Sequence, residues 1–238
     1  MIDGGPCGTA FDLQAAVERV MALSRETRQD SAELTGSRLR RLESVQAALV
    51  EQGLWTSGPS TLYAVLGLTR REVESCRVLG WIMDPLAPHG LGTAVLDQLL
   101  GWLEEQAEVA SFSRSALAGV QVVTEEARRR SRADLVLYGQ GWEIVIEAKL
   151  AAAEQPDQGH RLAADWPDAH YVFLTSRGLK MVTGRDTVWT PMRWDTVNSF
   201  VRVALLDAKP PPTPEATTAR NAVRDYLIAT GHLEHDQR

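Results

Sequence analysis

The chain has 238 residues, of which 44 % are hydrophobic and 24 % are charged, and its formal net charge is −6 at pH 7. These proportions are typical of a soluble globular protein with a hydrophobic core, and two cysteines exclude a disulfide framework. No apolar run approaches the length of a membrane span, and residues 1–10 lack the pattern of a secretory signal, so a cytoplasmic protein is expected.

Residues 1–58 predict an N-terminal helical extension of two helices, and residues 59–238 predict a second domain. Apolar residues recur at helical spacing in residues 11–25 and again in residues 31–52. In the second segment they form one face, which consists of Leu39, Leu42, Val45 and Leu49. This pair of helices either packs on the second domain or forms an oligomer contact, which makes a homodimer one expectation.

The second domain is expected to begin with helices and to continue with a sheet. Helices are predicted over residues 70–83, 93–109, 156–165, 195–206 and 215–230. The first of them ends before Asp84-Pro85, because a residue that precedes proline leaves the helical region. Strands are predicted over residues 120–124, 132–138, 142–149, 171–175 and 187–189. This order predicts an α/β fold with helices on both sides of the sheet.

Acidic groups lie near the ends of two strands that Gln140-Gly141 would join as a two-residue turn. In that register Asp134 lies opposite Glu147, on the same face, with Cβ atoms roughly 5 Å apart. Lys149 shares the face, because side chains alternate along a strand. A three-residue loop would turn Asp134 to the other face unless a bulge restored it.

Two carboxylates and one ammonium at one end of a hairpin suit phosphodiester hydrolysis. Carboxylate oxygens are the ligands of Mg²⁺ or Mn²⁺, and such an ion activates water and neutralises charge on a phosphate. Lys149 could orient the water or stabilise the transition state. The alternative is a hairpin whose charged ends are solvated surface groups.

Several motifs together resemble one bacterial branch of the PD-(D/E)XK nuclease superfamily. They lie in the order of that branch, and they are Glu72–Pro85, His89–Gly92, Asp134, Glu147–Lys149, Glu154–Gln158, Tyr171–Thr175 and Pro191–Trp194. The resemblance covers residues from about 70 to 200. It implies a restriction-endonuclease-like fold, which is a mixed β-sheet flanked by helices.

The resemblance also implies roles for individual residues. Asp134 and Glu147 would bind the metal together with the Ala148 carbonyl, Lys149 would be the catalytic lysine, and Glu72 would reach the metal through water. Gln158 would contact substrate. The implied activity is a Mg²⁺- or Mn²⁺-dependent nuclease that cuts DNA rather than RNA, in bacterial defence or DNA processing.

The sequence departs from the family pattern at two positions. Leu162 occupies the place of a tyrosine that follows Gln158 in related nucleases, and Ser75 occupies the place of a frequent histidine. With the acidic net charge, the first departure supports an alternative function: a catalytically silent module that binds nucleic acid or protein on the same fold.

Basic residues and one histidine are candidates for substrate contact. Arg128, Arg129, Arg130 and Arg132 precede the proposed active strand, and we expect them, Arg132 in particular, to contact phosphate. A second basic group lies at Arg38, Arg40 and Arg41. His89 either contacts DNA or shuttles a proton, or it is a turn residue whose ring forms local hydrogen bonds.

Overall fold

The computed structural model describes residues 35–54, 58–69, 71–107, 111–150, 152–184 and 186–231. The chain divides into two compact units, Met1–Gly58 and Pro59–Arg238. In the first unit residues 35–51 are helical, and the apolar side chains of Leu39 and Leu42 are 56 % and 67 % exposed. The helix expected over residues 11–25 lies outside the described residues.

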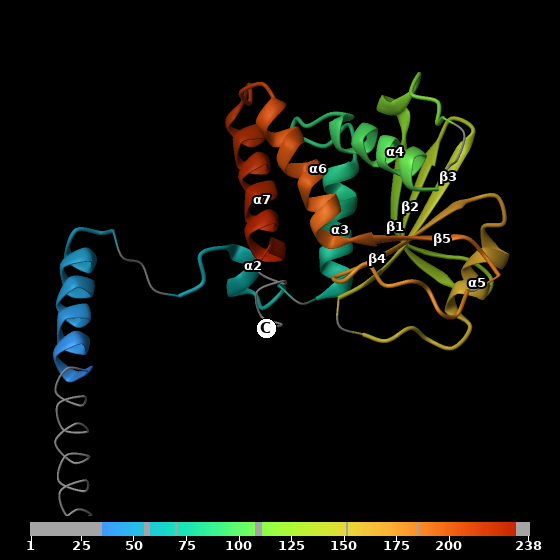
Figure 1. Ribbon diagram of the computed structural model, residues 1–238. Helices are drawn as coiled ribbons and strands as arrows, with labels where there is room; N and C mark the ends of the chain where they lie inside the picture. Colours follow the sequence, from blue (N-terminus) through green and yellow to red (C-terminus); the bar gives the residue numbers. More distant parts are fainter. Residues whose placement is uncertain are drawn as a thin grey trace, which may run out of the picture. The chain divides into compact units, whose positions relative to one another are not determined.

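The second unit contains a five-stranded mixed sheet whose strands follow one another in chain order (Figure 1). Pairs β1–β2 and β2–β3 are antiparallel, and pairs β3–β4 and β4–β5 are parallel. The strands are β1 (Gln121–Ala127), β2 (Arg132–Gly139), β3 (Trp142–Lys149), β4 (His170–Thr175) and β5 (Trp189–Arg193). The predicted α/β fold with a mixed sheet and flanking helices is therefore confirmed.

The helices lie on both faces of the sheet, with α5 on one side and α3, α4, α6 and α7 on the other (Figure 1). Their bounds are α2 (Leu62–Val65), α3 (Glu72–Met83), α4 (Ala94–Ala107), α5 (Gln158–Asp165), α6 (Trp194–Asp207) and α7 (Pro214–Gly231), with a short 3-10 helix at Leu117–Gly119. Among the described residues no helix is both long and apolar enough to cross a bilayer.

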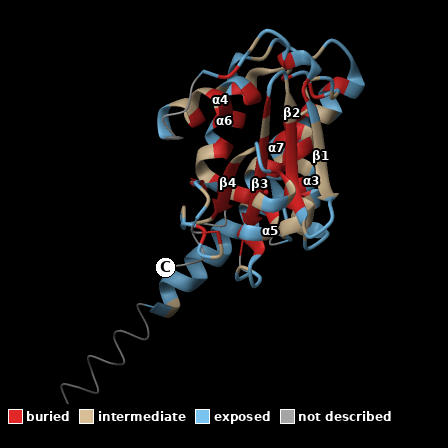
Figure 2. Cartoon of the chain, turned by 90° about the vertical axis from the view of Figure 1, so that its right-hand side faces the viewer, coloured by how far each residue is buried: buried red, intermediate tan, exposed pale blue. Residues whose placement is uncertain are grey.

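Alternation along the strands divides the core between these two layers. Leu135 and Ile144 belong to the larger core under α3, α4, α6 and α7. Val136 and Val145 belong to the smaller core under α5, which contains the fully buried Trp166. Strands β2, β3 and β4 are buried at the centre of the unit (Figure 2). The odd-numbered residues that follow Val145 on β3 therefore continue on the α5 side.

The β2–β3 turn has the length that the sequence predicts. Gly139 pairs with Trp142, which leaves Gln140-Gly141 as a two-residue turn, and Gly141 has a φ of 79°. Such a positive φ suits glycine in a tight hairpin. The last pair of this ladder is Leu135 with Ile146, and one further step places Asp134 opposite Glu147.

Helix α3 packs closely on the sheet because it carries a glycine at the contact. A Cβ atom on Gly80 would lie 2.6 Å from Thr124 Cγ2 on β1 and 3.1 Å from Leu135 Cδ1 on β2. Both distances are shorter than ordinary van der Waals contact. The close approach fixes the position of the α3 N-terminus, where Glu72 is the first helical residue.

Strand β5 begins later and extends further than the sequence predicts. The expected strand covered residues 187–189, whereas the observed strand is Trp189–Arg193 and contains Pro191. Proline has no N–H to donate to a ladder, but β5 is the last strand of the sheet, and an edge position tolerates it. Helix α6 then begins directly at Trp194.

Candidate active site

Asp134 is held at the end of β2 by the neighbouring strand. Its Oδ2 accepts a hydrogen bond of 2.9 Å from the Ala148 backbone N–H, and the side chain is only 7 % exposed. The contact takes the place of a backbone pair at the end of the β2–β3 ladder. Asp134 therefore lies beside the Glu147-Ala148-Lys149 segment, as the predicted register requires.

Glu147 is almost completely buried, and only one of its carboxylate oxygens is hydrogen-bonded. Its Oε1 accepts a hydrogen bond of 2.5 Å from Lys149 Nζ and a second one from Gln158 Nε2. Its Oε2 has no hydrogen-bond donor among the described residues. A buried carboxylate oxygen without a partner is unfavourable unless another group binds to it.

Three oxygen atoms surround the Lys149 ammonium group. Nζ lies 2.5 Å from Glu147 Oε1, 2.9 Å from the Ala148 carbonyl oxygen and 3.1 Å from Glu72 Oε1. The second oxygen of Glu72 accepts a hydrogen bond of 3.1 Å from the Leu150 N–H, so the start of α3 is tied to the end of β3. Oxygen atoms from β3 and α3 therefore surround a positive charge at this point.

Burial and charge shift the pKa values of both β3 groups. Burial and the nearby Asp134 charge together raise the pKa of Glu147 to about 8, although Lys149 acts to lower it. Burial lowers the pKa of Lys149, but the charges of Glu147, Asp134 and Glu72 outweigh burial and raise it above its ordinary value. Lys149 is therefore protonated at neutral pH, and more positive charge is needed to keep Glu147 ionised.

The donor set at this site fits a hard divalent cation. The groups present are the unpartnered Glu147 Oε2, the Asp134 carboxylate and the Ala148 carbonyl, which are all oxygen donors of the kind that Mg²⁺ and Mn²⁺ prefer. Within the described part of the chain no three His, Cys, Asp or Glu side chains form a metal cluster by themselves. The backbone carbonyl and water would have to complete the coordination, which is usual for Mg²⁺.

A pocket of about 440 Å³ opens over these groups. Its acidic floor includes Glu72, Asp134 and Glu147, and three arginines also line it: Arg130, Arg132 and Arg161. Arg132 is paired with Glu125 at 3.3 Å, yet its side chain remains 55 % exposed. Arg130 forms no side-chain hydrogen bond or ion pair with the described residues. Acidic and basic groups in one pocket suit a phosphate bound through a cation.

Gln158 lies in the site, but it faces Glu147 in this structure. Its Nε2 donates to Glu147 Oε1, and its Oε1 accepts a hydrogen bond of 3.1 Å from the Gln155 N–H. Both ends of the amide are therefore engaged, and the residue is 8 % exposed. Four residues later, Leu162 is 0 % exposed in the smaller core, so this position provides no substrate contact.

His89 is placed as a structural residue, which agrees with the alternative of a turn histidine. It is 0 % exposed, its Nδ1 accepts a hydrogen bond of 3.1 Å from the Leu91 N–H, and its Nε2 lies 3.0 Å from the Trp81 carbonyl. Its own carbonyl accepts from Arg220 on α7. Both ring nitrogens are occupied, which leaves none for the substrate contact that the sequence suggested.

Arg128 has an internal role, in contrast to the expectation for the basic segment before β2. Its guanidinium donates to the Tyr138 hydroxyl at 2.8 Å and to the Asp165 carbonyl, and it stacks 4.3 Å from the centre of the Trp166 ring. The Asp165 carboxylate also accepts from the Arg130 N–H at 2.9 Å. These contacts attach the β1–β2 loop to the end of α5.

Sequence reasoning missed the part of Glu125 in this arrangement. It has a φ of 52°, and its carboxylate pairs with Arg77 of α3 and with Arg132 of β2. The dipeptide Glu125-Glu126 between a strand and a basic segment was the available signal, but its partners are distant in sequence. Glu125 links the start of β2 to α3 beside the pocket.

A comparison with protein families gives one match. The family model of the PD-(D/E)XK nuclease superfamily matches residues 61–163, a segment that contains Glu72, Asp134, Glu147 and Lys149. Comparisons with curated proteins and with solved structures give no match. The match confirms the resemblance to the superfamily from before α2 into α5, and it ends before the motifs at Tyr171–Thr175 and Pro191–Trp194.

Proposed function

We propose that this chain, whose residues 61–163 match the PD-(D/E)XK nuclease superfamily, is a metal-dependent hydrolase of DNA phosphodiester bonds. The superfamily match supports nuclease activity in general. The choice of DNA over RNA, of Mg²⁺ or Mn²⁺, and of a role in bacterial defence or DNA processing belongs to this proposal.

One observation carries the proposal. The buried Glu147 Oε2 has no donor among the described residues, and it belongs to a residue that lies beside Asp134, the Ala148 carbonyl and Lys149. A purely structural ion pair would satisfy both carboxylate oxygens, because a buried unpaired oxygen lowers stability. The arrangement is instead suited to a ligand that binds oxygen atoms.

The residues would divide the work as follows. Asp134, Glu147 and the Ala148 carbonyl would hold the divalent ion, which when bound would acidify an attacking water and neutralise charge on the scissile phosphate. Lys149 would hold the water or the phosphate oxygen by a charged hydrogen bond. Glu72 would keep Lys149 in position through its 3.1 Å contact with Nζ.

The arginines around the pocket would bind the substrate itself. Arg130 and Arg132 leave their guanidinium groups exposed at the pocket edge, and each can donate two parallel hydrogen bonds to a phosphate. Their placement above the acidic floor would orient the scissile phosphate toward Lys149. Such positioning contributes strongly to phosphoryl-transfer rates.

The test is cleavage of labelled DNA and RNA with Mg²⁺, with Mn²⁺ and with EDTA. We expect cleavage of DNA that EDTA abolishes, and losses of at least about a hundredfold for Asp134→Ala and Lys149→Ala. Lys209→Ala is the matched control, since it removes an exposed lysine outside the pocket. Equal cleavage by wild type and by both active-site variants would refute the proposal.

The silent binding module is the alternative that this experiment separates. Retention of DNA in a binding assay without turnover in either metal, on single strands and duplexes alike, would favour it. The substituted family tyrosine, Leu162, is buried and so removes a substrate contact without removing a charged group from the site.

A further inference from the structure

A second pocket adjoins the active-site pocket and shares Lys149 with it. Its volume is about 520 Å³, and it extends along the β4 side of Lys149. The residues that form its far wall belong to the segment after β4, from Ser176 to Val182. The two pockets therefore meet at Lys149.

The far wall of this second pocket is fixed by hydrogen bonds. Thr175 Oγ1 accepts a hydrogen bond of 2.8 Å from the Leu179 N–H. Glu154 Oε1 accepts one of 2.9 Å from the Val182 N–H, and Glu154 Oε2 accepts one of 2.8 Å from the Thr183 N–H. Glu154 thus fixes the position of Val182 and Thr183, which are distant from it in sequence. The pocket is therefore formed before any ligand binds.

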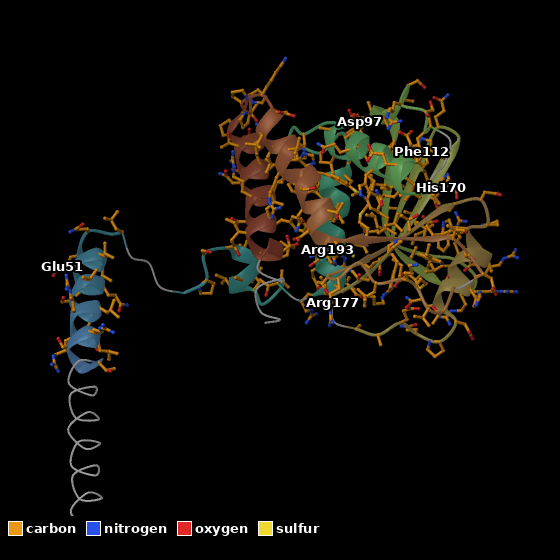
Figure 3. All side chains as sticks on the ribbon, in the orientation of Figure 1. Glu51, Asp97, Phe112, His170, Arg177 and Arg193 are labelled. Atoms are coloured by element: carbon orange, nitrogen blue, oxygen red, sulfur yellow. The ribbon has the colours of Figure 1, made fainter. Side chains whose placement is uncertain are left out.

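The balance of charge in the second pocket is positive. Arg177 and Lys180 line it, both are exposed, and neither forms a side-chain hydrogen bond or ion pair with the described residues. The Glu154 carboxylate is the acidic group of the lining, and it is already engaged by backbone N–H groups. Arg177 lies at the end of the unit opposite Phe112 and His170 (Figure 3). Both cations are therefore available to bind an anion.

Apolar side chains complete the lining. Leu179 and Val182 are 55 % and 56 % exposed, and Ala152 and Ala153 also line the pocket. Exposed apolar groups and two cations in one pocket suit a ligand with both a flat apolar part and a negative charge. A nucleotide has both, in its base with sugar and in its phosphate.

We propose that this second pocket binds the nucleotide that flanks the scissile phosphate, and that its substrate is a single strand. The proposal rests on the proposed nuclease function. Arg177 and Lys180 bind the flanking phosphate, while Leu179 and Val182 contact the base or sugar. A duplex keeps its bases in the stack and presents only its backbone, so a pocket of this volume favours an unstacked nucleotide.

The experiment measures binding of a labelled oligonucleotide by fluorescence anisotropy, as a single strand and as a duplex of the same sequence, with EDTA present. The variant is Arg177→Ala/Lys180→Ala in the full chain. The matched control is Arg202→Ala/Lys209→Ala, which removes the same two kinds of charge from exposed positions outside both pockets. Circular dichroism confirms that both variants fold.

We expect about tenfold weaker binding of the single strand by the pocket variant, with the control unchanged. The slope of log affinity against log salt concentration should become shallower by about 0.7, which is the contribution of one neutralised phosphate on a single strand. Equal losses of single-strand and duplex binding would overturn the single-strand assignment. Unchanged binding, or an equal loss in the control variant, would overturn the subsite.

Cleavage separates this inference from the proposed function. If wild type cleaves and the pocket variant cleaves with the same KM, the subsite fails and the nuclease stands. If wild type does not cleave but binds a single strand through Arg177 and Lys180, the subsite stands and the nuclease fails. If wild type neither cleaves nor binds, both fail.

Discussion

Lys149 donates a hydrogen bond of 2.5 Å to Glu147 Oε1, while Glu147 Oε2 receives none from the described residues. The two residues are two positions apart on one strand, and the ammonium compensates only one of the two Glu147 oxygens. The ammonium satisfies one carboxylate oxygen and leaves the other to a different positive group. The relation between these two side chains leads to the first prediction.

Replacing Lys149 with alanine should strengthen metal binding while it abolishes cleavage. The ammonium occupies Glu147 Oε1 and the Ala148 carbonyl, both of which belong to the proposed metal ligands, and its charge repels a divalent ion. Calorimetric titration with Mn²⁺ should show affinity at least about tenfold higher, or about 1.4 kcal/mol, for Lys149→Ala. Lys209→Ala serves as control. Weaker Mn²⁺ binding by Lys149→Ala would show that the lysine does not compete with the ion.

Leu162→Tyr, which introduces the family tyrosine, should lower the free energy of unfolding and should not improve substrate binding. Leu162 is 0 % exposed and packs in the smaller core with Trp166, so a larger ring with a hydroxyl group has no room there. Overpacking of this kind costs about 1–3 kcal/mol of unfolding free energy. Urea denaturation of Leu162→Tyr and of the conservative Leu162→Met should show a large loss for the first and a small one for the second. Tighter DNA binding by Leu162→Tyr would contradict this.

Replacing Arg128 should lower the stability of the protein, whereas replacing Arg130 should weaken DNA binding. Arg128→Ala breaks contacts with Tyr138, Asp165 and Trp166, and it should lower the unfolding free energy by about 1–3 kcal/mol. Arg130→Ala should change stability little, because the Arg130 side chain acts on Asp165 through its charge alone, but it should weaken DNA binding and reduce its salt dependence. The two variants are matched controls for one another in melting and in anisotropy. If both variants changed stability and DNA binding in the same way, the assignment of a structural role to Arg128 and a binding role to Arg130 would be refuted.

The contribution of His89 to stability should be lost as the pH is lowered from about 7.5 to about 5.5, while Glu147, whose pKa is raised to about 8, contributes with the opposite sign. Burial lowers the pKa of His89, and its Nδ1 must stay unprotonated to accept from the Leu91 N–H. The unfolded chain therefore binds a proton near the ordinary histidine pKa of about 6.5, while the folded protein resists it. Stability from this group is present above that pH and is lost below it, with a slope of at most about 1.4 kcal/mol per pH unit for one proton.

Burial also lowers the pKa of His170, which adds a second contribution of the same sign. Urea unfolding at several pH values is the measurement. On acidification His89→Asn should lose less stability, or gain more, than wild type, and the exposed His160→Asn should behave like wild type. A larger loss in His89→Asn than in wild type would reverse the sign assigned to His89.

The sequence was sufficient for the hairpin because its determinants are local. A two-residue turn at Gln140-Gly141 and the alternation of side chains place Asp134 and Glu147 on one face. The contact of Glu72 with Lys149 joins residues 77 positions apart, and the family motif implied only that Glu72 reaches the metal through water. The burial of His89 was not predictable, since it depends on Arg220 of α7 and on the packing of α3.

The second pocket was beyond prediction for a related reason. Its wall exists because Glu154 accepts backbone N–H groups from Val182 and Thr183, a contact that no local pattern specifies. The same holds for Arg128: its neighbours in sequence suggested a phosphate contact, but its position in the fold gave it Tyr138 and Trp166 as partners. At both places the residue types predicted charged side chains, but tertiary contacts determined which groups those side chains bind.

The absence of a side chain at Gly80 makes the site sensitive to a position that no substrate touches. Gly80 and Glu72 lie on the same rigid helix, about 12 Å apart along its axis at the usual helical rise. A single added methyl group would meet Thr124 Cγ2 at 2.6 Å and push the helix away from the sheet. Glu72 would then move away from the end of β3. A substitution at Gly80 would therefore alter the charge and the order of the site, although Gly80 itself contacts no substrate.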